Sequence, residues 1–489
     1  MKTLSILVFS ASLLLSVSSL AANNAGETAE KRSIKEFVSP DGRIDIEAVK
    51  NSGYQGSLDL DGFDFLIDPK TGEPLVQVSA SSASPSHPDN IYWDNSISPS
   101  LQGVDGTVLA LAVFDSNLIV AGRFTSAGGV TAEHIASWDG TSWSALRRGV
   151  NSWVFALTVY DNKLIAAGIF TAAGGVTANR IASWDGSSWS ALGTGINSGV
   201  IALTVYNNQL IAGGHFTTAG GVSASHIASW DGTSWSALGA GMSSTVHALT
   251  VYNNQLIAGG FFTTAGGVSA SRIASWDGTS WSALGTAMDS TVTALTLYNN
   301  QLIVGGVFTT AGGVAARRVA SWDGTSWSAL GTAMNSFVLA LTVYNNQLIA
   351  GGGFLTAGGV LADYIASWDG TSWSSLGTGM NKIVRALTVY DNTLIAGGDF
   401  TSAGNKFSAY LAQWTKSCCV GNRGDFNGDG DNANILDLTY IVDFIFRGGA
   451  ESSCPEEADI NNDGTPSNIL DLTFIVDRIF RGGPAPGPC

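Results

Sequence analysis

Short apolar runs, separated by turns rich in glycine, asparagine and aspartate, follow one another along most of this chain. In residues 246–284 the runs are "VHALTVY", "NQLIAGG", "ASRIASW" and "SWSAL". Runs of this length with β-branched and aromatic residues, bounded by Asn253-Asn254, Gly266-Gly267 and Asp277-Gly278, are typical of β-strands joined by tight turns. The pattern therefore predicts four strands per unit, and it shows no helical periodicity.

The four-strand unit recurs with a fixed period. The tryptophans that end the third strand are spaced by 46 residues without insertion or deletion, and Trp93 precedes the first of them by 45 residues. A fixed period in this range, with four strands per repeat, is typical of propeller blades. The repeated tryptophans are Trp138, Trp184, Trp230, Trp276, Trp322, Trp368 and Trp414.

The strand count predicts how the ring closes. The first three strands occur seven times, beginning near Val108, but the last copy ends at Trp414 with no fourth strand after it. The missing strand is expected upstream in "IYWDNSISPSL", at Ile91 to Leu101, which matches the end of strand three and strand four. This segment would complete the last blade, so that no sheet edge stays open. The sequence thus predicts an all-β seven-bladed propeller over residues 91–414.

The string "SWDGTSWSALG" stands unchanged at 229–239, 275–285 and 321–331. Its Asp-Gly pair is expected to form the turn between strands three and four, because both residues tolerate turn dihedral angles. The flanking tryptophans are expected to pack between neighbouring blades. We therefore interpret the repeated acidic motif as structural.

The wider repeat supports a resemblance. The pattern "GG-x-F-T-x-A-G-G…I-A-x-W-D-G-x-x-W-x-x-L-G" stands at Gly259 to Gly285 and resembles the kelch-like propeller of the yeast Rax2 cortical-marker family and its bacterial relatives. The resemblance covers Trp93 to Trp414. It implies a fold and says little about chemistry.

Two positions of the repeat differ from copy to copy and predict a candidate ligand face. One precedes Phe-Thr at the end of strand two, and the other is the second residue of strand one. Both lie near loops at the same end of the ring, where propellers commonly bind ligands. The alternative interpretation is that these positions simply tolerate variation. The candidate residues are Arg123, His215, His247, Arg385 and Asp399.

The inventory of reactive side chains does not favour catalysis. Glycosidases need two carboxylates that flank the bond, whereas the propeller segment holds one glutamate, Glu133, and most of its aspartates are repeated turn residues such as Asp139 and Asp185. Cysteine is absent from residues 91–414, which excludes a copper centre of the Tyr-Cys type. We therefore predict no catalytic residues, and a carbohydrate-active enzyme remains the alternative.

The C-terminal segment carries a duplicated motif. "DFNGDGDNANILDLTYIVDFIFRGG" begins at Asp425, and "DINNDGTPSNILDLTFIVDRIFRGG" begins 34 residues later at Asp459. Each copy opens with D-x-N-x-D-G, whose alternating oxygen-bearing side chains suit Ca²⁺ as in an EF-hand loop. The apolar spacing of Ile435, Leu438, Val442 and Ile445 predicts a helix that ends before Gly448-Gly449, and the second copy repeats it.

Paired loop–helix repeats of this kind resemble dockerin modules, which bind cohesin domains through calcium-loaded helices. The resemblance covers Gly424 to Gly483 and implies two calcium ions and a cohesin-like or other protein partner. The closing aspartate falls at loop position 13, where the dockerin pattern has position 12. The implied ligands are Asp425, Asn427, Asp429, Asp431, Asn434 and Asp437 in the first loop and Asp459, Asn461, Asp463, Thr465, Asn468 and Asp471 in the second.

The two termini of the chain and its net charge narrow the cellular compartment and the kinds of ligand that the sequence predicts. Residues 1–21 are typical of a secretory signal peptide, residues 22–90 predict an extension with a Ser/Pro linker, and no later stretch is a membrane-span candidate. The net charge of −16 argues against a nucleic-acid ligand. Export permits disulfides in the tail, in a pairing that the sequence leaves open. The candidate cysteines are Cys418, Cys419, Cys454 and Cys489.

Together these patterns predict a secreted or cell-surface protein in which a seven-bladed propeller precedes a small α-helical calcium-binding module at 415–489. The function that they favour is non-catalytic: the propeller binds a glycan or protein ligand, and the dockerin-like tail anchors or assembles the chain. The alternatives are an enzyme of polysaccharide breakdown and a structural surface or adhesion protein.

Overall fold

The computed structural model describes residues 87–98, 103–286, 288–332, 334–415, 424, 426, 434–447, 460 and 468–483, and the backbone of short strands before residue 79. The chain divides into two compact units, Met1–Ser86 and His87–Cys489. In the first unit the strands form a three-stranded sheet of order β1-β3-β2 and a hairpin of β4 and β5. Their bounds are β1 (Thr3–Ser5), β2 (Arg32–Ser33), β3 (Ser57–Asp59), β4 (Phe63–Ile67) and β5 (Pro74–Val78).

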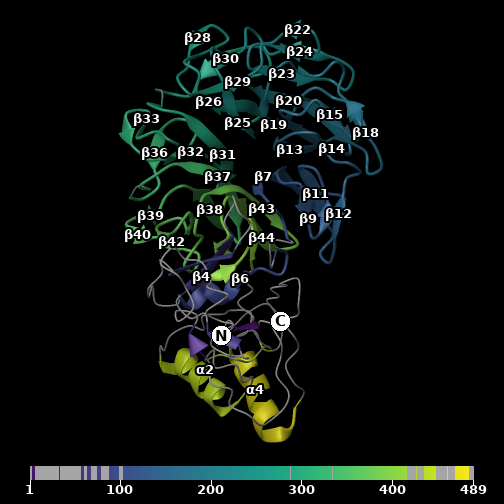
Figure 1. Ribbon diagram of the computed structural model, residues 1–489. Helices are drawn as coiled ribbons and strands as arrows, with labels where there is room; N and C mark the ends of the chain where they lie inside the picture. The colour runs from purple at the N-terminus through teal and green to yellow at the C-terminus, as the bar shows by residue number, and fades with distance from the viewer. Residues whose placement is uncertain are drawn as a thin grey trace, which may run out of the picture. The chain divides into compact units, whose positions relative to one another are not determined.

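The second unit contains seven four-stranded antiparallel sheets, and the first strand of each lies innermost beside the first strands of its neighbours (Figure 1). The prediction of a seven-bladed all-β propeller is therefore confirmed. Blades one and two comprise β7 (Thr107–Phe114), β8 (Asn117–Arg123), β11 (Ile135–Trp138), β12 (Trp143–Ala145), and β13 (Val154–Tyr160), β14 (Lys163–Gly168), β17 (Ile181–Trp184), β18 (Trp189–Ala191). Blades three and four comprise β19 (Val200–Tyr206), β20 (Gln209–Gly214), β23 (Ile227–Trp230), β24 (Trp235–Ala237), and β25 (Val246–Tyr252), β26 (Gln255–Gly260), β29 (Ile273–Trp276), β30 (Trp281–Ala283). Blades five and six comprise β31 (Val292–Tyr298), β32 (Gln301–Gly306), β35 (Val319–Trp322), β36 (Trp327–Ala329), and β37 (Val338–Tyr344), β38 (Gln347–Gly352), β41 (Ile365–Trp368), β42 (Trp373–Ser375). Blade seven comprises β43 (Val384–Tyr390), β44 (Thr393–Gly398), β47 (Leu411–Trp414) and β6 (Trp93–Asp94).

A small hairpin follows strand two in every blade, in a place where the sequence predicted only a turn. In blade four, Ala265 pairs with Val268 around Gly266 and Gly267, whose φ angles of 58° and 88° favour glycine. The hairpins are β9 (Ser126–Ala127) with β10 (Val130–Thr131), β15 (Ala172–Ala173) with β16 (Val176–Thr177), and β21 (Thr218–Ala219) with β22 (Val222–Ser223). The others are β27 (Thr264–Ala265) with β28 (Val268–Ser269), β33 (Thr310–Ala311) with β34 (Val314–Ala315), β39 (Thr356–Ala357) with β40 (Val360–Leu361), and β45 (Ser402–Ala403) with β46 (Lys406–Phe407).

The hydrophobic core lies between blades. Strand two reads as a continuous apolar run because neighbouring blades cover both of its faces, and Leu256 to Gly260 of β26 are all buried. One cluster joins Tyr252 and Ile257 of blade four to Leu302 and Phe308 of blade five. The same arrangement recurs around the ring, so each blade is stabilised by both neighbours.

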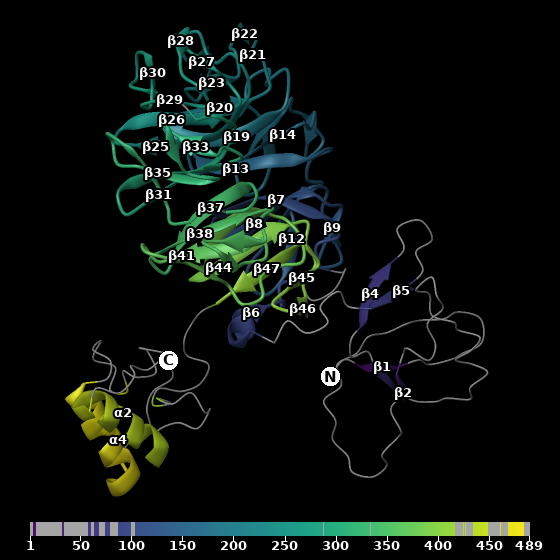
Figure 2. The ribbon, with the colours of Figure 1, turned by 90° about the vertical axis from the view of Figure 1, so that its left-hand side faces the viewer.

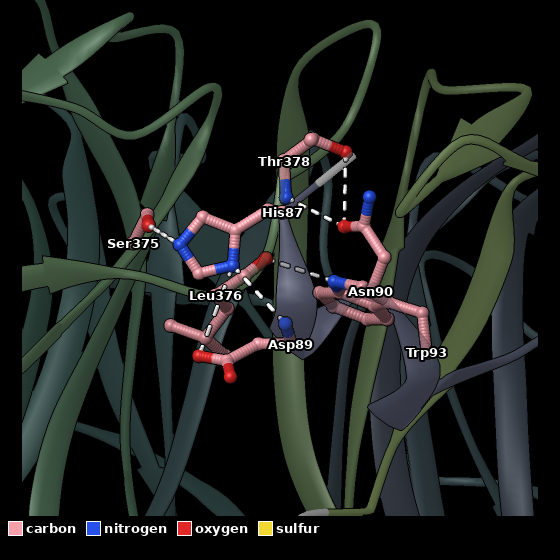
Figure 3. A network of polar contacts seen from close by, with 7 residues as sticks. All are labelled: His87, Asp89, Asn90, Trp93, Ser375, Leu376 and Thr378. Carbon is pink, nitrogen blue, oxygen red and sulfur yellow. Dashed lines mark hydrogen bonds and ion pairs between the residues drawn. The ribbon is translucent and has the colours of Figure 1, made fainter. Parts of the chain in front are cut away.

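The N-terminal strand closes the ring as predicted. Trp93 of β6 pairs with Trp414 of β47, and the strand completes the last blade (Figure 2). The Trp93 side chain is fully buried and its Nε1 donates a hydrogen bond of 2.9 Å to the Leu376 carbonyl of blade six. Figure 3 shows the preceding 3-10 helix η2 (Pro88–Tyr92), in which the Asn90 side chain accepts a 2.7 Å bond from the Thr378 N–H. Closure therefore involves hydrogen bonds as well as burial.

The described part of the tail contains two helices of equal length, α2 (Ile435–Arg447) and α4 (Ile469–Arg481), which pack against each other. Both end where the sequence predicted, and Gly482 caps α4 at a φ of 72°. The shared core is formed by Phe426, Ile441, Ile460 and Ile475. The predicted apolar stripe is displaced by part of a turn, because Ile435 is half exposed and Ile441 occupies the core.

Candidate functional site

The repeated acidic motif is a self-contained turn. In blade four the Asp277 carboxylate accepts hydrogen bonds from the N–H groups of Ser280 and Thr279 and from both of their hydroxyls, at 2.7–3.0 Å. These bonds hold the pKa of Asp277 well below its usual range. The indole N–H of Trp281 donates to the Leu238 carbonyl of the preceding blade. These contacts give the motif a structural role, and its tryptophan packs between blades.

We expect the melting temperature to fall as the pH is lowered from about 5 to about 2. The six equivalent aspartates have pKa values lowered by hydrogen bonds in the folded chain, so they stabilise it above their ordinary pKa of 3.8 and lose that contribution as they protonate. Thermal unfolding followed by circular dichroism measures the effect. A melting temperature that is constant over this range would contradict the assignment. The six are Asp139, Asp185, Asp231, Asp277, Asp323 and Asp369.

The two variable positions predicted as a ligand face lie at one end of the blades. Strand one begins where strand two ends, as in the pairing of Val246 with Gly260. The register shifts between Val246 and Ala248, so His247 is the extra residue of a β-bulge. The same shift occurs at this position in every blade. A bulge redirects a side chain away from the regular pleat, and bulges are frequent next to functional sites.

The predicted face residues form three local groups. Arg385 binds Asp399 in an ion pair of 2.7 Å, and the Thr107 hydroxyl donates to the other Asp399 oxygen at 3.0 Å. The Arg123 guanidinium lies over the Trp153 ring at 3.9 Å. Each group crosses the boundary between two blades.

The third group contains two histidines. The rings of His215 and His247 lie edge to face with centroids 6.3 Å apart, and the Thr245 hydroxyl lies 2.8 Å from Nδ1 of His215. Burial lowers the pKa of His247, and the neighbouring His215 lowers it further. His247 is therefore held toward the neutral form.

These contacts reveal a third variable position that the sequence analysis missed: the residue just before strand one, which in blade one is the first residue of the strand. In successive blades it is Thr, Trp, Gly, Thr, Thr, Phe and Ile, and through it the end of one blade's strand two contacts the start of the next blade. Arg123–Trp153, His215–Thr245 and Asp399–Thr107 are such contacts. We call the three variable positions of all blades the variable circle. Its members are Thr107, Leu109, Arg123, Trp153, Phe155, Ile169, Gly199, Ile201, His215, Thr245, His247, Phe261, Thr291, Thr293, Val307, Phe337, Leu339, Gly353, Ile383, Arg385 and Asp399.

A second ring of side chains supports this end of the blades. The residue before strand three has a positive φ in all seven blades, although it is never glycine. Such a conformation is costly for a bulky residue. In blade four the Arg272 guanidinium offsets the cost, because it donates to the Phe261 carbonyl at 2.7 Å and covers the Phe261 ring. The ring consists of His134, Arg180, His226, Arg272, Arg318, Tyr364 and Tyr410.

The two ends of the propeller differ in charge. The variable circle and the positive-φ ring hold five arginines and four histidines, with Asp399 as the acid among them, and the acids Asp105, Glu133 and Asp363 lie beside them. The opposite end holds the turns between strands one and two and between strands three and four, where Lys163 is accompanied by many carboxylates. An anionic ligand is therefore attracted to the end with the variable circle. The carboxylates of the opposite end are Asp115, Asp139, Asp161, Asp185, Asp231, Asp277, Asp323, Asp369 and Asp391.

In the tail, four of the predicted calcium ligands lie within the described residues. Asp437 and Asp471 are fully buried, and the Asp437 carboxylate accepts bonds of 2.9 Å from the N–H groups of Phe426 and Asn434. The Asn434 and Asn468 side chains cap α2 and α4. The predicted ligands outside the described residues are Asp425, Asn427, Asp429, Asp431, Asp459, Asn461, Asp463 and Thr465, and the four cysteines Cys418, Cys419, Cys454 and Cys489 also lie outside.

These contacts are compatible with a calcium ion. The Asp437 carboxylate is buried, and a carboxylate is the type of ligand that Ca²⁺ prefers. Its oxygens connect the loop at Phe426 to the start of α2, and a buried carboxylate needs charge compensation. Across the residues that the structure describes, no three His, Cys, Asp or Glu side chains gather in a metal-binding group.

Comparison with known sequences identifies the family. Three overlapping segments of the chain, residues 92–253, 188–337 and 237–393, match the Rax2 C-terminal beta propeller domain. The chain belongs to this family. The match to the Rax2 propeller domain, at 92–393, coincides with most of the region for which the repeat pattern indicated the same resemblance, and no curated protein matches the chain.

Several solved structures are similar to this Rax2-family chain at low identity. The computationally designed Ika8 protein is 21% identical, with 64% of this chain and 98% of that one covered and a TM-score of 0.40. The WD40 beta propeller domain of Doa1 is 14% identical, with coverage of 66% and 97% and a TM-score of 0.44. The extracellular domain of a hybrid two-component system from B. thetaiotaomicron is 11% identical, with coverage of 66% and 39% and a TM-score of 0.45. At these scores the likenesses carry no argument about function.

The described part of this Rax2-family chain contains no helix that could span a membrane. None of its helices is both long and apolar enough to cross a bilayer.

Proposed function

We propose that this chain is an exported, non-catalytic binding protein whose propeller holds a glycan or protein ligand on the variable circle and whose tail assembles the chain with a protein partner in the presence of calcium. The observation that supports the propeller's role is the continuity of the circle. The scaffold repeats almost without change, whereas the three positions that vary contact one another across blade boundaries. Variable positions that contact one another on one surface are what a binding face on a rigid scaffold requires.

The side chains of the circle suit recognition better than catalysis. Trp153 and Phe261 expose 36% and 53% of their surface, and each is covered in part by an arginine. Exposed aromatic rings beside cations offer apolar contact together with charge. The one carboxylate of the circle, Asp399, is bound by Arg385 and Thr107 and is not paired with a second acid. The arrangement therefore lacks the two carboxylates that hydrolysis of a glycosidic bond needs.

The tail's proposed role rests on its internal symmetry. Both helices expose large apolar side chains at equivalent positions, and such exposed apolar groups mark interaction surfaces. The two halves also share buried aspartates at equivalent positions, Asp437 and Asp471. Loss of one loop should therefore weaken partner binding without abolishing it. The exposed pairs are Ile435 and Ile469, Leu436 and Leu470, and Phe446 and Phe480.

A glycan array and a hydrolysis screen on the same purified chain test the propeller's role. We expect retention of an acidic glycan without turnover, because the cationic end carries the aromatic surface. If the array retains no glycan, the result would favour a protein ligand. A cross-linking screen at Trp153 would then identify that protein. Turnover that is lost on a single substitution at Glu133 or Asp399 would instead establish the enzyme alternative and refute the proposal.

A further inference from the structure

A pocket of about 290 Å³ lies between blades five and six, and none of its lining residues belongs to the variable circle. Its wall is formed by Val319, Leu330 and Met334 on one side of the gap and by the Trp373 indole of blade six. Ala315, at the end of β34, and Arg317, from the loop between β34 and β35, complete it. For comparison, a cavity of about 150 Å³ binds benzene. The pocket is therefore large enough for a ring with a short side chain.

The pocket exists because one inter-blade contact is missing. In the other blades the residue just ahead of the blade makes a β-bridge to the small hairpin, as Ile196 does with Ala219 and Met242 with Ala265. Met242 also donates a 3.0 Å bond to the Ser225 carbonyl. Met334 occupies the same place but is not part of such a bridge. Among the described residues, the pocket therefore coincides with the boundary at which this bridge is missing.

A substitution accompanies the missing bridge. The residue before the bridge is glycine at positions 149, 195, 241 and 379, where its φ is positive, but alanine at 287 and 333. A Cβ at Gly195 would lie 2.5 Å from the Asn179 carbonyl oxygen, so alanine cannot take that conformation without a shift. At Met288, after Ala287, the bridge persists with its hydrogen bond lengthened to 3.4 Å. After Ala333, which lies outside the described residues, the bridge at Met334 is lost.

Two further departures from the repeat converge on the same gap. Position 315 is alanine here and Thr, Ser, Leu or Phe in the other blades, and position 317 is arginine here and Glu, Asn, Ser, Asp or Ala elsewhere. The first removes side-chain volume from the pocket wall. The second places a cation at the pocket, and the Arg317 side chain is exposed. The scaffold itself does not require this combination, because the other copies fold without the changes at 315 and 317, and alanine replaces the glycine in only one of them, at 287.

The chemistry of the lining defines the ligand. The Trp373 indole N–H already donates to the Leu330 carbonyl at 2.9 Å, and the Thr332 hydroxyl donates to the Gly358 carbonyl. No carboxylate forms an ion pair with Arg317 among the described residues. We propose that this pocket binds a small apolar carboxylate, whose apolar body contacts Leu330, Met334 and Trp373 and whose carboxylate binds Arg317. A free arylalkanoic acid and the C-terminus of an apolar peptide both have this chemistry.

Calorimetric titration of the full chain tests the proposal with three probes: 3-phenylpropionate, the neutral 3-phenylpropanol, and an acetylated Leu-Phe dipeptide with a free carboxyl group. We expect saturable binding of at least one carboxylate and binding of the alcohol that is about tenfold weaker or worse, since a hydrogen bond to a charged group is lost. Arg317→Gln should weaken carboxylate binding about tenfold and remove the preference over the alcohol. Tighter binding of 3-phenylpropionate would indicate a free acid as the natural ligand, and tighter binding of the dipeptide would indicate a peptide C-terminus.

The alanine positions provide a matched pair of variants. Ala333→Gly should restore the bridge between Met334 and Ala357 and abolish binding, whereas Ala287→Gly, at the neighbouring boundary, should leave the affinity unchanged. Melting temperatures of all variants show that they fold. The proposal is wrong if no carboxylate binds to the parent chain, if Arg317→Gln binds as tightly as the parent, or if Ala333→Gly retains full affinity.

Discussion

Replacement of Trp93 with alanine is expected to lower the free energy of unfolding by about 3–5 kcal/mol, as truncation of a buried tryptophan does. Trp93 is fully buried between Trp414 and blade six, with its ring centroid 4.9 Å from that of Trp414. The substitution removes the buried side chain that holds the fourth strand, β6, in the last blade, and it thereby exposes the edge of β47. Because every blade packs on two neighbours, the effect should extend to the whole ring.

Chemical denaturation of the full chain measures this change. Trp153→Ala is the matched control, because Trp153 is also a tryptophan but lies partly exposed in the variable circle. The control should change stability by about 1 kcal/mol or less. Equal stabilities for Trp93→Ala and the parent chain would show that the ring does not depend on its N-terminal strand.

The second large effect is expected in the tail. Asp437→Ala and Asp471→Ala should each remove one of two calcium sites, because each deletes the carboxylate that closes its loop. Calorimetry on the full chain should find two calcium ions for the parent and one for each variant. Helical circular dichroism of the parent should fall when a chelator is added, since the loops' negative charges repel one another without the ion.

Asp443→Ala is the control for the tail, because it removes the same charge from the outer side of α2, where Asp443 pairs with Arg447 at 3.7 Å. It should leave two calcium ions bound. If the parent binds no calcium, or if its helices are fully formed in chelator, then Asp437 and Asp471 serve only as helix caps and the calcium-dependent assembly is refuted.

The fold could be predicted from the sequence because its period is strict. The 46-residue spacing, the Asp-Gly turns and the unpaired Trp414 together indicate seven blades closed by Trp93, and the structure has this arrangement. The small hairpins were missed because their strands are two residues long, too short for an alternating pattern. The bulge at His247 was missed because an extra residue leaves no mark in composition.

The candidate site could be predicted only in part. Comparison of copies identified Arg385 and Asp399, which form an ion pair, and His215 and His247, which lie side by side. It missed Trp153, because the residue before strand one was not compared between blades, although its variation is visible in the sequence. The positive φ at Arg272 could not be predicted, since nothing in the residue type indicates a left-handed backbone.

The central claim is that the variable circle is the binding face of the propeller. The most direct test is the affinity of the ligand retained in the screen, measured for Arg123→Ala with Trp153→Ala and, as control, for Lys163→Ala, which removes a cation from the opposite end. We predict that the double variant loses at least tenfold in affinity, whereas the Lys163 variant binds as the parent does. Equal affinity for the parent and the double variant, with a loss in the Lys163 variant, would contradict the account.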